Sequence, residues 1–198
     1  MDRGGRFFRP RLAFSAKRGR TAPAAQSDHA DRFREVMLPH MDAAYNFARY
    51  LARDPVAAED IVQDAFLRAF RAIDSWRGEA AKAWLLAIVR NAFVDWVKAN
   101  RRELVTADTE DLNIDPDTPE SLLLQARDVA MLRTTVERLP EPFREALVLR
   151  ELEELSYKEI ALITAVPIGT VMSRLARARQ MLSVLLLPTE EPERRAEA

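Results

Sequence analysis

Apolar side chains recur along this chain at spacings of three and four residues, the period of a helix with one buried face. Two such stripes lie between Asp31 and Arg102. The first stripe consists of Ile61, Val62, Ala65, Phe66, Ala69, Phe70 and Ile73. The second stripe consists of Trp84, Leu85, Ile88, Ala92 and Trp96. Asp54-Pro55 before the first stripe is a helix-start signal. We therefore predict two long helices here, joined by a short loop over 74–80.

The periodic pattern stops at residues 103–120, which hold two prolines and seven acidic but no basic residues. That composition predicts a flexible linker. The helical pattern resumes at Ser121, breaks at 139–142, and continues in three predicted helices over about 142–152, 156–164 and 167–186. The predicted fold is all-α, with two small helical domains at 28–102 and 121–187 joined by the acidic linker.

The last two predicted helices are typical of a helix-turn-helix. Ser156-Tyr-Lys-Glu159 is a capping-box pattern, so a helix is expected to start at Tyr157. Pro167 suits the first turn of the next helix. Ala165 stands in the turn where glycine is usual, which costs on the order of 1 kcal/mol if the residue is left-handed. The final helix has an apolar stripe of Ile168, Val171, Leu175, Ala178, Leu182 and Leu185.

Charge and composition narrow the class of protein. The 198 residues carry a net charge of −1, but residues 1–27 hold seven basic side chains and one acid. We expect 1–27 to be a disordered basic extension, either without consequence or adding attraction to phosphates. The tail 188–198 is short and charged. No segment reaches the length of a membrane span, and the start has no apolar core typical of a secretory signal.

Candidate chemistry is sparse. There are no cysteines, and the two histidines, His29 and His40, lie in or near the expected flexible start. We therefore expect no catalytic residue, no metal and no cofactor, in a cytoplasmic protein. Glu153-Glu154 and the acids of 108–117 are interpreted as solvated charge, and no glycine-rich phosphate loop is present.

Several segments, in the same order along the chain, resemble one family. Residues Ala58–Ala69, AEDIVQDAFLRA, resemble the core-polymerase-binding helix of extracytoplasmic-function (ECF) RNA polymerase sigma factors. Residues 139–147, 155–161 and 169–179 resemble the family's C-terminal domain, which reads the -35 promoter element. Residues in the segment 84–102 fit the intervening DNA-melting segment. The resemblance covers about residues 31–187.

The resemblance implies roles for individual residues. It implies that 28–102 is sigma region 2 and that 121–187 is sigma region 4. Contacts to the clamp of the largest polymerase subunit would come from Asp60, Gln63, Asp64 and Leu67. Contacts to the -10 element would come from Trp76, Arg77, Lys82, Asn91, Asp95, Lys98, Arg101 and Arg102. Contacts to the -35 element would come from Lys158, Thr170, Ser173, Arg174 and Arg177.

The resemblance also has consequences for loops and partners. The loop from Trp76 to Lys82 corresponds to a pocket for a flipped -10 base, although Trp76 stands where phenylalanine is more common and a core-packing role is equally open. Met172 occupies a position that is often basic in the family. The linker would run through the RNA exit path of the polymerase, or would simply be solvated. The implied partners are core RNA polymerase, promoter DNA and an anti-sigma factor.

Two other functions remain open from the residues alone. A helix-turn-helix regulator that acts without core polymerase would explain 140–187 but would leave 58–102 without a role. A helical adaptor that binds only proteins would give Arg174 and Arg177 no role in DNA binding. An enzyme is not favoured, because no pattern of catalytic residues stands out.

Overall fold

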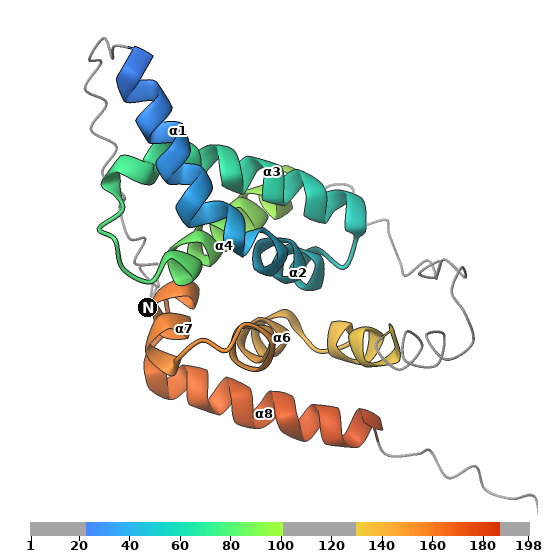
Figure 1. Cartoon of the computed structure of the whole chain (residues 1–198). Helices are drawn as coiled ribbons and strands as arrows, with labels where there is room; N and C mark the ends of the chain where they lie inside the picture. The colour runs from blue at the N-terminus through green and yellow to red at the C-terminus, as the bar shows by residue number, and fades with distance from the viewer. Residues whose placement is uncertain (1–22, 101–129, 187–198) are drawn as a thin grey trace, which may run out of the picture.

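The computed structural model describes residues 23–100 and 130–186, and every regular element within these ranges is a helix (Figure 1). The predicted all-α fold with two helical domains is confirmed. We call residues 23–100 the N-terminal body and residues 130–186 the C-terminal body. The predicted linker, 103–120, and the predicted tail, 188–198, lie outside the described residues.

The N-terminal body contains α1 (Pro23–Met37), α2 (Met41–Ala52), α3 (Pro55–Ala72) and α4 (Ala81–Asn100). Two short 3-10 turns, η1 (Leu38–His40) and η2 (Ile73–Ser75), follow α1 and α3. Residues 1–27 were predicted to be disordered, but α1 begins at Pro23, so residues 23–27 are helical. The histidines are also better ordered than predicted, since His29 lies on α1 and His40 on η1.

The start of α3 follows from its local sequence. Asp54 has an extended backbone, and its carboxylate accepts a hydrogen bond of 2.8 Å from the backbone N–H of Ala57. Pro55 occupies the first helical position, where its missing N–H leaves no hydrogen bond unmade. The predicted helix-start signal is therefore confirmed.

The apolar stripes of α3 and α4 form the core of the N-terminal body. Ile61, Ala65 and Ala69 of α3 are buried, as are Ile73 of η2 and Leu85, Ile88 and Ala92 of α4. Full burial of a side chain such as Ile61 or Leu85 stabilises the fold by roughly 1.5–3 kcal/mol. Val62, Phe66 and Phe70, predicted on the same buried stripe of α3, instead lie toward its outer side and are only partly covered.

The C-terminal body begins with a helical segment at 130–137, followed by α6 (Glu141–Leu147) and the π-helical turn η3 (Val148–Leu152). It ends with α7 (Tyr157–Thr164) and α8 (Ile168–Leu186). The predicted helix over 142–152 is thus an α-helix whose last turn widens. Residues 121–129, where we predicted that the helical pattern resumes, lie outside the described residues.

The helix-turn-helix is present in the predicted place. Ser156 and Glu159 form both hydrogen bonds of the capping box at the start of α7. Ala165 ends α7 in the left-handed conformation, with φ 54° and ψ 40°. The axes of α7 and α8 are bent by 100° at the turn, within the range of helix-turn-helix units. The carbonyl of Pro167 accepts the first hydrogen bonds of α8, whose first residue is Ile168. Pro167 therefore immediately precedes α8, whereas it was predicted to lie in the first turn.

The two bodies are packed together. α2 contacts α6 and α4 contacts α7, and α6 lies between the N-terminal body and α8 (Figure 1). Buried side chains of both bodies belong to one continuous apolar cluster. Among the described helices, no single one is long and apolar enough to cross a membrane; α7 and α8 together pass by length and composition only.

Candidate nucleic-acid and protein interfaces

A groove of about 790 Å³ runs along the outer side of α3, against α1 and α2. Its floor is apolar and includes Phe33, Tyr45, Val62 and Phe66. The predicted polymerase-binding residues Asp60, Gln63 and Leu67 line the same groove, together with Asp42 and Glu59. An apolar groove with an acidic rim is typical of a surface that binds another protein.

The groove explains why some apolar residues of α3 are not buried in the core. Leu67 is 51 % exposed and Phe70 is 39 % exposed, although neither is polar. Asp64, the fourth predicted polymerase-binding residue, is half-buried and pairs with Arg68 one turn along α3. Asp60, Gln63 and Leu67 therefore share the groove, while Asp64 points to a neighbouring cation.

The loop between η2 and α4 contains the predicted -10 pocket. Trp76 is half-buried and its Nε1–H donates a hydrogen bond of 2.8 Å to the carbonyl of Glu79. Residues 77–80 are exposed, and Gly78 and Ala80 have φ of +85° and +45°. Around Gly78 no heavy atom lies within 4 Å of where a Cβ would be. The loop is thus fixed by the hydrogen bond of Trp76, while residues 77–80 are exposed to solvent.

Three of the predicted -10 residues of α4 lie on one exposed side of the helix. Asn91, Asp95 and Lys98 are all exposed. Asp95 Oδ2 accepts a hydrogen bond of 2.8 Å from Arg68 of α3, and Lys98 lies 3.4 Å from Asp95 Oδ1. The hydrogen bond from Arg68 holds the pKa of Asp95 below its ordinary value. Asp95 is therefore already paired, and it is positioned by Arg68, which was not among the predicted site residues. Arg101 and Arg102 lie outside the described residues.

Lys82 faces the C-terminal body. Its Nζ lies 2.7 Å from Glu153 Oε2 and donates a 2.9 Å hydrogen bond to the carbonyl of Glu153. Glu153 is only 5 % exposed, so our interpretation of Glu153 as solvated charge was wrong. The physical reason is that the contact between the two bodies covers it and supplies a cation. Glu154, beside it, is exposed as expected.

The outer side of α8 carries the predicted -35 residues. Ser173 and Arg177 are exposed, as is Lys158 on α7. Thr170 and Arg174 are half-buried. Arg174 Nη1 lies 3.9 Å from Glu145 Oε2, so this arginine leans back toward α6. Ile168, predicted on the buried stripe of α8, is 46 % exposed and is the first residue of the helix.

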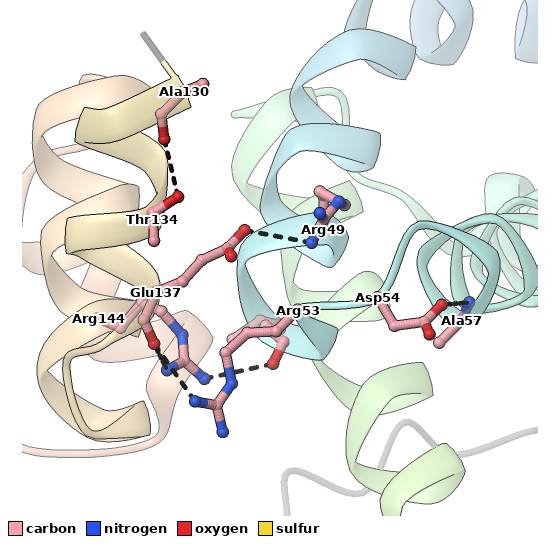
Figure 2. A network of polar contacts seen from close by, with 9 residues as sticks. Arg49, Arg53, Asp54, Ala57, Ala130, Thr134, Glu137 and Arg144 are labelled. Carbon is pink, nitrogen blue, oxygen red and sulfur yellow. Dashed lines mark hydrogen bonds and ion pairs between the residues drawn. The ribbon is translucent and has the colours of Figure 1, made fainter. Parts of the chain in front are cut away.

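Buried charge joins the two bodies. Arg49 Nη1 of α2 lies 3.1 Å from Glu137 Oε1, and both side chains are buried (Figure 2). Arg144 donates hydrogen bonds to the carbonyls of Glu137, Leu139 and Leu51, at 3.1, 2.6 and 3.3 Å. Burial raises the pKa of Glu137 and lowers the pKa of Arg144 to about 10, which leaves the guanidinium charged at neutral pH.

A second buried carboxylate, Glu145 of α6, lies between α4 and α8. Arg90 of α4 donates to its Oε1, and Arg174 of α8 approaches its Oε2. Burial raises the pKa of Glu145 although both cations oppose that change. Neither Arg90 nor Glu145 was predicted as a site residue, because no local pattern marks a pair that lies 55 positions apart. Among the described residues, no group of three or more His, Asp or Glu could hold a metal ion.

Comparison with known proteins assigns both bodies. Residues 36–103 match the family Sigma-70 region 2, and residues 130–182 match Sigma-70, region 4. The ECF RNA polymerase sigma-E factor of Haemophilus influenzae is 37 % identical over 151 residues, which is 71 % of this chain and 79 % of the relative. The ECF RNA polymerase sigma factor SigM of Bacillus subtilis is 33 % identical and covers 76 % of this chain and 93 % of the relative.

Solved structures agree with this assignment. The sigma factor RpoE of Bartonella quintana, solved in complex with the anti-sigma factor NepR, matches with a TM-score of 0.68 and 32 % identity. That match covers 79 % of this chain and 97 % of the other. CnrH, solved in complex with the cytosolic domain of CnrY, matches with a TM-score of 0.58 and 26 % identity over 82 % of this chain and 94 % of the other.

Two regions of the sigma-70 type in this order define a sigma factor, the subunit of RNA polymerase that directs initiation at promoters. The relatives narrow the class further: the chain belongs to the ECF sigma factors. The function predicted from the sequence, promoter-specific initiation of transcription, is thereby confirmed. ECF sigma factors are not a family of enzymes.

Proposed function

We propose that this sigma factor has three separate binding surfaces. The α3 groove binds core polymerase, the 76–82 loop with α4 binds the -10 element, and α8 binds the -35 element. The observation that carries the proposal is the helix-turn-helix, in which α8 leaves α7 at 100° with Ser173 and Arg177 exposed. A helix held in this way can enter the major groove.

On α8, Arg177 is the strongest candidate for reading a base. It is exposed, whereas Arg174 is half-buried and approaches Glu145. An arginine that is free to extend can donate two hydrogen bonds to guanine O6 and N7. Ser173, Thr170 and Lys158 hold the phosphates beside it. In this proposal Arg174 joins the DNA contact only after it leaves Glu145.

In the N-terminal body, the proposed polymerase contact uses the α3 groove. What is known of the family implies that the clamp of the largest polymerase subunit presents a coiled coil, and an apolar groove can accept a helix. Asp60 and Gln63 would supply the polar rim and Leu67 the apolar contact. Asp64, paired with Arg68, would act from the edge.

An anti-sigma factor is the proposed regulatory partner. The proposal is supported by the two solved relatives, RpoE and CnrH, each of which was solved with a partner protein. Such a partner would block function by covering the α3 groove and the DNA-binding side of α8.

The proposal is tested by separating the surfaces with matched variants. Arg177→Ala should weaken binding of promoter DNA by holoenzyme by about 1–3 kcal/mol and relax the choice of one -35 base, with core affinity unchanged. Asp60→Ala combined with Leu67→Ala should weaken core affinity by about 1 kcal/mol or more without changing promoter choice.

Arg138→Ala and Glu35→Ala serve as controls, since both side chains are exposed and neither belongs to a proposed surface. Core affinity is measured by fluorescence anisotropy, and promoter choice by competition among -35 variants. Loss of core affinity in Arg177→Ala, or unchanged core affinity in the α3 double variant, would contradict the assignment of the surfaces.

A further inference from the structure

We infer that α1 positions the -10 loop, with His29 and Arg32 as the positioning residues. The inference rests on the proposed function of the 76–82 loop. Most of α1 precedes residue 36, where the match to Sigma-70 region 2 begins. Its contacts with the loop are therefore a feature of this chain that the match does not assign.

His29 ties α1 to the end of α3 and to η2. Its Nδ1 lies 3.1 Å from Asp74 Oδ1, and its Nε2 lies 2.9 Å from the backbone carbonyl of Phe70. The imidazole also meets the Phe70 ring edge-on, with 4.7 Å between ring centroids. The side chain of His29 is only 22 % exposed. The His29 side chain thus contacts both the last turn of α3 and Asp74 of η2, which precedes the loop.

Both partners of His29 are acceptors. A carboxylate oxygen and a backbone carbonyl accept hydrogen bonds, and neither donates. Each ring nitrogen of His29 faces one of these acceptors, so whichever nitrogen carries a proton has a partner.

Arg32, one turn further along α1, contacts the loop itself. Its guanidinium carbon lies 5.9 Å from the centroid of the Trp76 ring. The Nε1–H of the same indole is bonded to the Glu79 carbonyl. Trp76 is therefore held between a cation on α1 and the backbone of its own loop, while residues 77–80 stay exposed.

Aromatic packing keeps α1 in place for these contacts. Phe33, next to Arg32, meets Phe70 edge-on at 5.2 Å and Phe66 edge-on at 6.0 Å between centroids. The helix is thus anchored to α3 on one side and reaches the loop with the other. This arrangement sets where Trp76 stands relative to the open part of the loop, which is where a flipped base would enter.

The test uses holoenzyme assembled from core polymerase and the full chain, with a promoter fragment whose -10 region carries a 2-aminopurine reporter of opening. Arg32→Ala should reduce the fraction of open complex about two- to fivefold, the size of one exposed cation–π contact. Arg32→Lys keeps a cation over the indole and should restore most of the opening. His29→Ala should give a reduction at least as large as that of Arg32→Ala, since it removes the polar contacts to Asp74 and Phe70 and the ring contact with Phe70.

Two further measurements separate positioning from a general loss of structure. Core affinity and binding of a -35 duplex should not change in either variant. Arg34→Ala is the matched control, because Arg34 lies on the same helix, is exposed and pairs with Asp31. On a promoter that lacks the flipped base, carrying an abasic nucleotide there, the variants and the original chain should open equally poorly.

The outcomes distinguish this inference from the proposed function beneath it. If the abasic promoter lowers opening by the original chain but Arg32→Ala and His29→Ala match that chain on intact DNA, the positioning role is overturned and the loop's function stands. If the abasic promoter opens as well as the intact one, the proposed base pocket itself is overturned. A deficit of the variants that persists on the abasic promoter also overturns the positioning role.

Discussion

Ala165 adopts a backbone conformation that alanine rarely takes, with φ of 54° in the turn between α7 and α8. Glycine is usual at this position of a helix-turn-helix, so a strained turn was expected at Ala165 if its backbone is left-handed. In the structure, Ala165 adopts the left-handed conformation that the turn requires, so the strain predicted for a non-glycine residue is present there. The Ala165 N–H still bonds the carbonyl of Ala161, so the end of α7 is satisfied in spite of the strain.

Replacing Ala165 with glycine should therefore stabilise the protein. Relief of about 1–2 kcal/mol of left-handed strain outweighs the roughly 0.4–1 kcal/mol of chain entropy that glycine loses on folding. The expected net gain is about 0.5–1 kcal/mol in the free energy of unfolding, measured by urea denaturation.

Ala176→Gly is the matched control, since Ala176 is exposed within α8. That change should cost about 1 kcal/mol, the ordinary penalty of glycine inside a helix. A loss of stability in Ala165→Gly similar to that of the control would contradict the left-handed turn.

At the level of single residues, the sequence predicted exposure well and long-range pairing poorly. Asp60, Gln63, Ser173 and Arg177 are exposed as expected. Glu153 was predicted to be solvated and is buried against Lys82. The difference arises because exposure of a helical face follows from local periodicity, whereas the partner of Glu153 lies 71 positions away.

Among the elements, helix starts were the best predicted features because their signals are local. Asp54 and Pro55 begin α3, and Ser156 and Glu159 cap α7 where the pattern placed them. The outer side of α3 was less predictable, since apolar Phe66 and Phe70 there line a groove instead of the core. Periodicity alone does not distinguish a core stripe from an apolar groove that binds a partner.

The capping box offers a direct test at this scale. Ser156→Ala removes the hydroxyl that accepts from the Glu159 N–H and that donates to the Glu159 carboxylate at 2.6 Å. The expected loss in the free energy of unfolding is about 0.5–2 kcal/mol. Chemical denaturation followed by circular dichroism at 222 nm measures it.

Ser183→Ala is the comparison, because Ser183 is exposed within α8 and caps no helix. Its effect should stay within about 0.5 kcal/mol of zero. Equal effects of the two changes would show that the capping box does not stabilise α7.

In the whole molecule, the contact between the two bodies was not foreseen. The sequence predicted two domains and a linker, which are local properties, but nothing in it predicted that α2 would meet α6 or that α4 would meet α7. This contact engages one of the predicted DNA-binding residues directly, because Lys82 of α4 pairs with Glu153. Glu145 also lies at the contact, where it pairs with Arg90 of α4, whereas its contact with Arg174 lies within the C-terminal body.

The pKa of Glu145 gives this contact a dependence on pH. Burial raises that pKa above its ordinary value of 4.5, so the folded chain binds this proton more tightly than the unfolded chain does. The contribution of Glu145 to the free energy of unfolding therefore falls as pH rises from about 4.5 to the raised pKa, and is constant above it.

Glu145→Gln removes the titrating group and should flatten this part of the stability profile. Urea denaturation of both proteins at a series of pH values from 4 to about 7 measures the difference. The slope of the original chain should be more negative than that of the variant. Parallel profiles would contradict the burial of a titrating carboxylate between the bodies.

The central claim is that this chain directs initiation at promoters through core polymerase. Run-off transcription with purified core polymerase and genomic DNA fragments, with and without the protein, tests it most directly. We predict discrete new start sites that share upstream sequences near -35 and -10 and that require both core and this chain. Tight binding of duplex DNA by the chain alone, with no new transcripts when core is present, would contradict the claim.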